Sequence, residues 1–78
     1  MLTFREWLFT KRNYNSPIGD LARDTWRIQA EWAGHEVDSL RGILLRRCAH
    51  RDAFAALKRA AKNYDKYCAK RALELIPA

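Results

Sequence analysis

Cysteine and histidine are the residue types in this sequence that could bind a metal ion or attack a substrate. Two of each are present, and together they could supply the four ligands of a zinc site: His35, Cys48, His50 and Cys68. Their spacing matches no common zinc pattern, so two core cysteines and two surface histidines are the favoured interpretation. A nucleophilic Cys/His pair needs a third group to orient it, and the sequence indicates none. We therefore expect neither a metal site nor a cofactor.

Two aspartates are a second candidate for chemistry. Asp20 and Asp24 lie one helical turn apart, and paired carboxylates can perform general acid–base catalysis. Near the start of a helix a negative charge also suits the helix dipole, and we favour this role. The sequence contains no glycine-rich phosphate-binding loop. We predict that the protein is not an enzyme.

Positive charge gives the strongest functional signal. The chain has 78 residues and a formal net charge of +6. Residues 1–39 carry five basic and six acidic residues, whereas residues 40–78 carry ten basic and three acidic ones. The whole excess therefore lies in the C-terminal half, where it would attract polyanions.

Eight residues of that half form what we call the basic surface: Arg46, Arg47, Arg51, Lys58, Arg59, Lys62, Lys66 and Lys70. The four lysines recur every four residues, which at about 100° per residue makes a slowly drifting row on one helix. The arginines favour bidentate contacts with phosphate or carboxylate groups. We predict that this surface binds nucleic acid. Tyr64 and Tyr67 lie near it and could stack on bases, although the core is the favoured place for Tyr64. A merely solvated helix face is the alternative.

Two tryptophans offer a different function. Phe9, Trp26 and Trp32 cannot all share the faces of the other apolar residues, and an exposed tryptophan can anchor a protein interface. The protein could then be a protein-interaction module, a small phage- or plasmid-borne inhibitor of a larger protein, or a homo-oligomer. The alternative is that a wide apolar face on the second helix buries Trp26.

Local signals predict two N-terminal helices. Thr3 and Glu6 form a capping box, which predicts a helix over residues 4–11. Ser16-Pro17 combines a capping oxygen with a proline at the first helical position. A second helix should start there and stop at Gly34.

Two more helices are expected in the C-terminal half. The third should span residues 37–49, although Gly42 costs about 1 kcal/mol inside it and indicates close backbone packing or a break. The fourth should span about residues 52–73, with Asp52 as a possible cap and Pro77 ending any continuation. If the turn around Gly34 is short, the second and third helices form a helix–turn–helix that presents Arg41 to DNA.

Apolar residues that recur every three or four positions predict the core: Phe4, Trp7, Leu8, Ile18, Leu21, Ala22, Thr25, Ile28, Trp32, Val37, Leu40, Ile43, Leu44, Phe54, Leu57, Ala61, Tyr64 and Cys68. Nothing alternates with the period of a strand. We predict a single all-α domain over residues 1–78, a compact bundle of four or five short helices.

The sequence also bears on where the protein works. No apolar run is long enough for a signal peptide or a membrane span, which favours the cytoplasm. A disulfide between Cys48 and Cys68 is not expected in that reducing compartment.

The N-terminal third resembles the YozE-like family of small bacterial proteins. The resemblance is carried by Phe4-x-x-Trp7-Leu8 and by the block from Ser16-Pro17-Ile18-Gly19-Asp20 to Asp24, and it extends through the closing helix as far as Tyr67. It implies a four-helix fold of the SAM-like type and no enzymatic activity. Domains of that type bind proteins or nucleic acids, so the resemblance does not choose between them.

Overall fold

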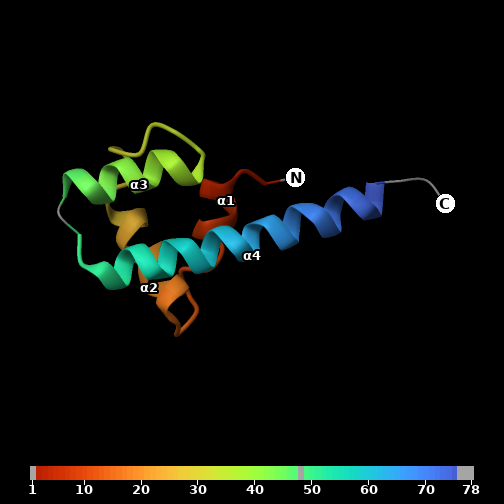
Figure 1. Cartoon of the computed structure of the whole chain (residues 1–78), viewed down its shortest axis with the longest axis horizontal. Coiled ribbons are helices and arrows are strands. Elements are labelled where there is room, and N and C mark those ends of the chain that lie inside the picture. The colour runs from red at the N-terminus through yellow and green to blue at the C-terminus, as the bar shows by residue number, and fades with distance from the viewer. Residues whose placement is uncertain (1, 48, 76–78) are drawn as a thin grey trace.

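The computed structural model describes residues 2–47 and 49–75 and contains four helices. They are α1 (Phe4–Phe9), α2 (Pro17–Arg27), α3 (Val37–Arg46) and α4 (Arg51–Leu75). No strand occurs in this part of the chain, so the predicted all-α bundle is confirmed. Figure 1 shows α1, α2 and α3 gathered around the N-terminal half of α4, which then continues alone.

Helix α1 begins where its capping box predicts. The Thr3 hydroxyl accepts a hydrogen bond from the Glu6 backbone N–H at 3.2 Å, and the Glu6 carboxylate accepts one from the Thr3 N–H at 3.0 Å. The backbone hydrogen bond from Thr3 lowers the pKa of Glu6. The helix ends at Phe9, two residues before the expected end, and turns carry the chain onward.

Helix α2 also begins as predicted, with Pro17 at its first position and Ser16 as its cap. The Ser16 hydroxyl accepts a hydrogen bond from the Gly19 N–H at 3.1 Å. A Cβ atom on Gly19 would collide with the carbonyl oxygen of Tyr14, which is backbone and cannot move aside cheaply. Glycine at this position therefore allows the loop before α2 to fold back closely on the helix.

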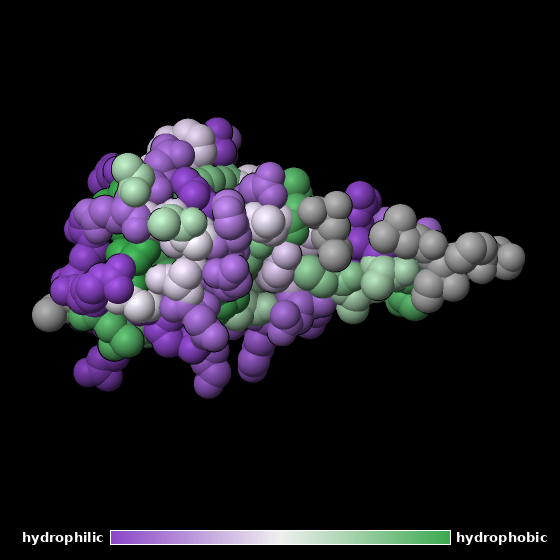
Figure 2. Space-filling model, turned by 90° about the horizontal axis from the view of Figure 1, so that it is seen from above, coloured by the Kyte–Doolittle hydropathy of each residue, from purple (hydrophilic) through white to green (hydrophobic). Residues whose placement is uncertain are grey.

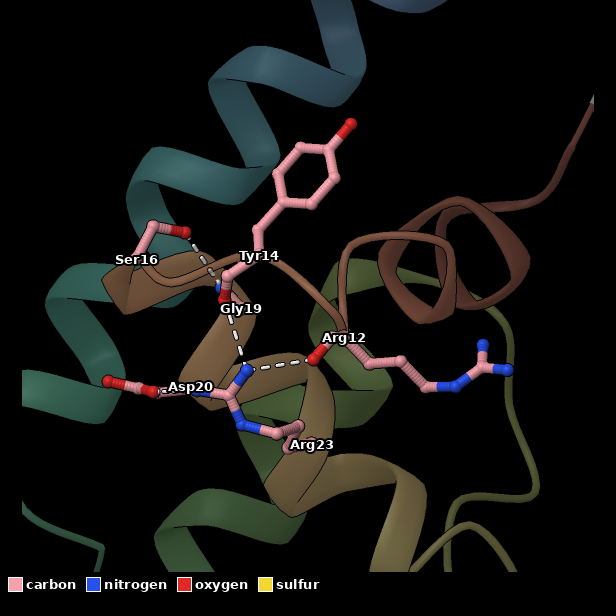
Figure 3. Close-up of polar contacts among 6 residues, drawn as sticks. All are labelled: Arg12, Tyr14, Ser16, Gly19, Asp20 and Arg23. Carbon is pink, nitrogen blue, oxygen red and sulfur yellow. Dashed lines mark hydrogen bonds and ion pairs between the residues drawn. The ribbon is translucent and has the colours of Figure 1, made fainter.

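Arg23, one turn further along α2, also binds the loop before this helix. Its guanidinium donates to the carbonyl oxygens of Arg12 at 2.8 Å and Tyr14 at 3.0 Å, as Figure 3 shows. It also pairs with Asp20 on its own helix. The loop between α1 and α2 thus has its carbonyl groups satisfied by a side chain that the sequence alone did not single out.

The predicted end of α2 is wrong. The helix stops at Arg27, and turns occupy residues 28–31, well before Gly34. Arg5 of α1 donates to the carbonyl oxygens of Gln29 at 3.2 Å and Trp32 at 2.9 Å. These long-range bonds satisfy carbonyl groups outside the helix, so the chain can leave α2 early and insert Trp32 into the core.

Helix α3 is shorter than expected and runs unbroken through Gly42. A Cβ on Gly42 would meet only the Arg46 guanidinium, at 3.7 Å, so neither the close backbone packing nor the break that we expected is present. The connection from α2 to α3 spans residues 28–36. A helix–turn–helix has a turn of only about three or four residues, so that interpretation is also wrong.

Helix α4 begins one residue before the expected start. The backbone N–H of Asp52 donates to Nδ1 of His50 at 3.2 Å, so the imidazole of His50 serves the first turn of the helix. Asp52 lies inside that turn and is not the cap. The expected stop at Pro77 lies outside the described residues.

One hydrophobic cluster joins the helices, and it contains Phe4, Trp7, Leu8, Phe9, Leu21, Ala22, Trp32, Leu40, Ile43, Leu44, Ala56, Leu57 and Ala60. Aromatic rings dominate one end of it. Phe4 lies 6.0 Å from Trp7, 6.2 Å from Trp32 and 5.5 Å from Tyr64, measured between ring centroids. This packing fixes α4 against α1 and so sets which side of α4 faces outward.

Candidate nucleic-acid interface

All eight residues of the basic surface have exposed side chains. On α4 the buried residues Ala56, Leu57 and Ala60 define the inner side of the helix. The lysine row, which is Lys58, Lys62, Lys66 and Lys70, lies away from that side. Arg51 lies on the same side of α4 as these lysines, because it precedes Lys58 by seven residues, which is about two helical turns.

The row forms a long array of charge that winds slowly around α4. From Arg51 to Lys70 the helix rises about 28 Å at 1.5 Å per residue. Within the described residues, none of the four lysines forms an ion pair. Asp65 is the one acidic residue between Asp52 and Glu74 in the sequence. The lysines therefore keep their charge available to a partner along most of the helix.

Arg47 differs from the lysines because it is already paired. Its guanidinium donates to both carboxylate oxygens of Glu31, at 2.6 Å and 3.3 Å. These hydrogen bonds lower the pKa of Glu31 and raise that of Arg47. The pair links the α2–α3 connection to the end of α3. Arg47 therefore holds these two segments together as well as contributing charge to the basic surface.

The other arginines lie in mixed surroundings. Arg59 lines a groove of about 490 Å³ between α2 and α4 together with Asp20, Asp24 and Asp52. Arg46 lines a shallower hollow with Glu31 and Asp38. The structure thus brings Arg51 and the lysines onto one side of α4 but places the remaining arginines near carboxylates.

Tyr64 and Tyr67 do not project into the basic surface. The Tyr64 hydroxyl donates to the Leu2 carbonyl oxygen at 2.7 Å, and the Tyr67 hydroxyl accepts from the Leu2 N–H at 3.2 Å. Their rings stack on each other at 5.8 Å. Burial, followed by a hydrogen bond with Cys68, raises the pKa of Tyr64 to about 12. Both rings are thus occupied in holding the N-terminal segment, and the predicted stacking role loses its support.

The two candidate anchor tryptophans have different environments. Trp32 is fully buried, and its Nε1–H donates to Ser39 at 2.6 Å, so it belongs to the core and offers no surface to a partner. Trp26 is 40% exposed. The Arg12 guanidinium lies 4.2 Å from the centre of its ring, and Phe9 packs on it edge to face.

Sequence reasoning missed the contacts of Lys11 and Arg12 with aromatic rings. Lys11 lies 5.3 Å from the Trp7 ring and 5.2 Å from the Tyr14 ring, and Tyr14 is exposed. The signal was the run Lys11-Arg12 directly after an aromatic helix. These cations cover aromatic faces, which shields the rings from water.

The candidate metal and nucleophile residues do not form a site in the part of the chain that is described. No group of three or more histidine, cysteine, aspartate or glutamate side chains is arranged to hold a metal ion there. Cys68 has a free thiol, and Cys48 lies outside the described residues. His35 and His50 are exposed. Asp20 pairs with Arg23, as noted above, and Asp24 lines the groove beside Arg59.

Of the described helices, none is long and apolar enough to cross a membrane. No family model, curated protein or solved structure matches the chain.

Proposed function

We propose that the protein is a non-catalytic module that binds nucleic acid through the basic surface of α3 and α4. The lysine row carries this proposal: four exposed lysines, without ion pairs among the described residues, lie along one side of one helix. A linear polyanion matches a linear array of cations, because each phosphate contact releases condensed counterions. Such contacts position a protein on nucleic acid but do not read its sequence.

The test is a fluorescence-anisotropy titration of a labelled DNA duplex at low salt. The double variant Lys62→Gln/Lys66→Gln removes two charges from the centre of the row and should weaken binding by about tenfold. The matched control Arg27→Gln/Arg41→Gln removes two exposed charges from outside the basic surface and should change binding far less. Equal effects of the two variants, or no binding by the native protein, would refute the proposal.

A protein partner is the second candidate, and Trp26 favours it. A ring that is 40% exposed and already aligned by Arg12 and Phe9 has the character of an interface anchor. In this alternative the basic surface steers the protein toward an acidic or nucleic-acid-binding partner, as a small phage- or plasmid-borne inhibitor would do. Nuclease-resistant capture of one bacterial protein, lost in Trp26→Ala but kept in Lys62→Gln/Lys66→Gln, would favour it over nucleic acid.

Membership of the YozE-like family and a SAM-like helix arrangement stay predictions, carried by the N-terminal residues that resemble that family. A cytoplasmic location is part of the same proposal, since both candidate partners are found there.

A further inference from the structure

The last two turns of α4 stand apart from the bundle. Every described side chain from Ala69 to Glu74 is exposed, including Leu73 at 70%. Figure 1 shows this end projecting beyond the other helices, and the molecule measures 47 Å along its longest axis against 26 and 18 Å across. We call residues 68–75 the free end of α4. It is about 12 Å long.

The free end continues the lysine row and adds charge on a second side. Lys66 and Lys70 lie about 40° apart around the helix, and Arg71 lies a further 100° round. Ala69 and Ala72 lie on the opposite sector, with the exposed Leu73 about 40° from Ala69, so that sector is apolar and uncharged. Figure 2 shows hydrophobic residues along this projecting end, in contrast to the largely hydrophilic surface over the bundle.

We propose that the free end of α4 enters the major groove of duplex DNA. This inference rests on the proposed nucleic-acid binding and names its substrate. An α-helix with its side chains is about 10–12 Å across, and the major groove of B-form DNA is about 12 Å wide. Lys66 and Lys70 then contact the phosphates of one groove wall and Arg71 those of the other, while the alanines face the base pairs.

Single-stranded nucleic acid fits this surface less well. Proteins that hold single strands stack bases on aromatic side chains, and residues 68–75 contain no aromatic residue. The nearest rings, Tyr64 and Tyr67, are hydrogen-bonded to Leu2. Duplex RNA fits less well for another reason, because its major groove is deep and too narrow for side chains to read.

The first experiment compares three labelled ligands of the same length and sequence: duplex DNA, duplex RNA and single-stranded DNA. Duplex DNA should bind at least about tenfold more tightly than either of the others at the same salt concentration. Equal or tighter binding of RNA duplex or single strand would overturn the inference and leave the proposed function standing. Binding to none of the three would instead refute the proposed function itself.

The second experiment asks whether the free end creates that preference. Lys70→Gln/Arg71→Gln should lower affinity for duplex DNA by about tenfold and for duplex RNA by only about twofold, because only DNA admits the helix. The charge-matched control Arg27→Gln/Arg41→Gln should leave the ratio of the two affinities unchanged. If Lys70→Gln/Arg71→Gln lowers both affinities by the same factor, the free end acts only by charge at a distance and the inference fails.

Removing a negative charge from the free end gives an independent check of its contact with DNA. Glu74 forms an ion pair with Arg71 at 3.3 Å. It lies about 200° round the helix from Ala72, so it holds the Arg71 guanidinium on the side away from the base pairs. Glu74→Gln should tighten binding to duplex DNA several-fold, since it releases Arg71 and removes a repelled charge. Unchanged or weaker binding in this variant would contradict placement of the free end in the groove.

Discussion

Single residues decide how closely the backbone of this small protein packs. At Gly19 the Tyr14 carbonyl group occupies the space of a side chain, whereas at Gly42 that space is nearly empty. Gly19 therefore permits a close contact that the fold uses, whereas Gly42 only weakens its helix.

Replacing Gly42 by alanine should stabilise the protein by about 0.5–1 kcal/mol, because alanine has the higher helix propensity and its methyl group meets only the flexible Arg46 side chain. Replacing Gly19 by alanine should destabilise it, since the new Cβ would collide with backbone. Urea unfolding followed by circular dichroism measures both. A gain in stability for Gly19→Ala would show that the loop before α2 is not held as described.

The Tyr64 hydroxyl gives a prediction with a defined pH range. Its pKa is raised from 10.0 to about 12 in the folded protein, so its contribution to stability is complete below pH 10 and is lost as the pH rises toward 12. Tyr64→Phe should remove that alkaline dependence and, through the lost bond to Leu2, cost about 1 kcal/mol at neutral pH. Unfolding measured from pH 8 to 12 in both proteins tests this, and an identical alkaline loss in Tyr64→Phe would contradict it.

At the scale of helices, the sequence predicts starts better than ends. Thr3 and Ser16 cap their helices through bonds to residues three positions on, so the signal is local and readable. The end of α2 depends instead on Arg5, which reaches 24 residues along the chain to Gln29. The helical pattern places Trp32 on the apolar face of the second helix, whereas the structure buries it from the connection after that helix.

Some features of the candidate interface can likewise be predicted from local sequence, and others cannot. The lysine row follows from a spacing of four and the buried side of one helix, so sequence reasoning placed it correctly on an exposed side. The ion pair of Arg47 with Glu31, the groove around Arg59 and the bonds of the tyrosines to Leu2 join distant parts of the chain. Such contacts need the three-dimensional packing, which no local pattern contains.

Arg5 should therefore matter more than its position in a six-residue helix indicates. Arg5→Met keeps an apolar side chain but takes from the Trp32 carbonyl group its Arg5 donor and from the Gln29 carbonyl group one of two donors, at a cost of about 1–3 kcal/mol. Arg41→Met, which removes an exposed arginine paired only with Asp38, is the control and should cost less than about 0.5 kcal/mol. Thermal unfolding of the two variants compares them, and equal melting temperatures would contradict the role of Arg5.

For the whole molecule, the structure combines a compact core with an extended charged helix. The N-terminal half, nearly neutral in charge, provides most of the residues that hold α4 in place. The C-terminal half carries the excess positive charge on a helix that continues past the bundle. This arrangement suits a surface that meets an extended polyanion, and it makes the response to salt the property that follows most directly from the account.

The salt dependence of binding to duplex DNA is the decisive measurement. If Arg51 and the lysine row make five phosphate contacts, the logarithm of the association constant should fall with the logarithm of salt concentration with a slope of about −4.5. For Lys62→Gln/Lys66→Gln the slope should be about −2.7, since two of these contacts are lost. A slope near zero, or an unchanged slope in the variant, would show that the lysine row does not bind nucleic acid.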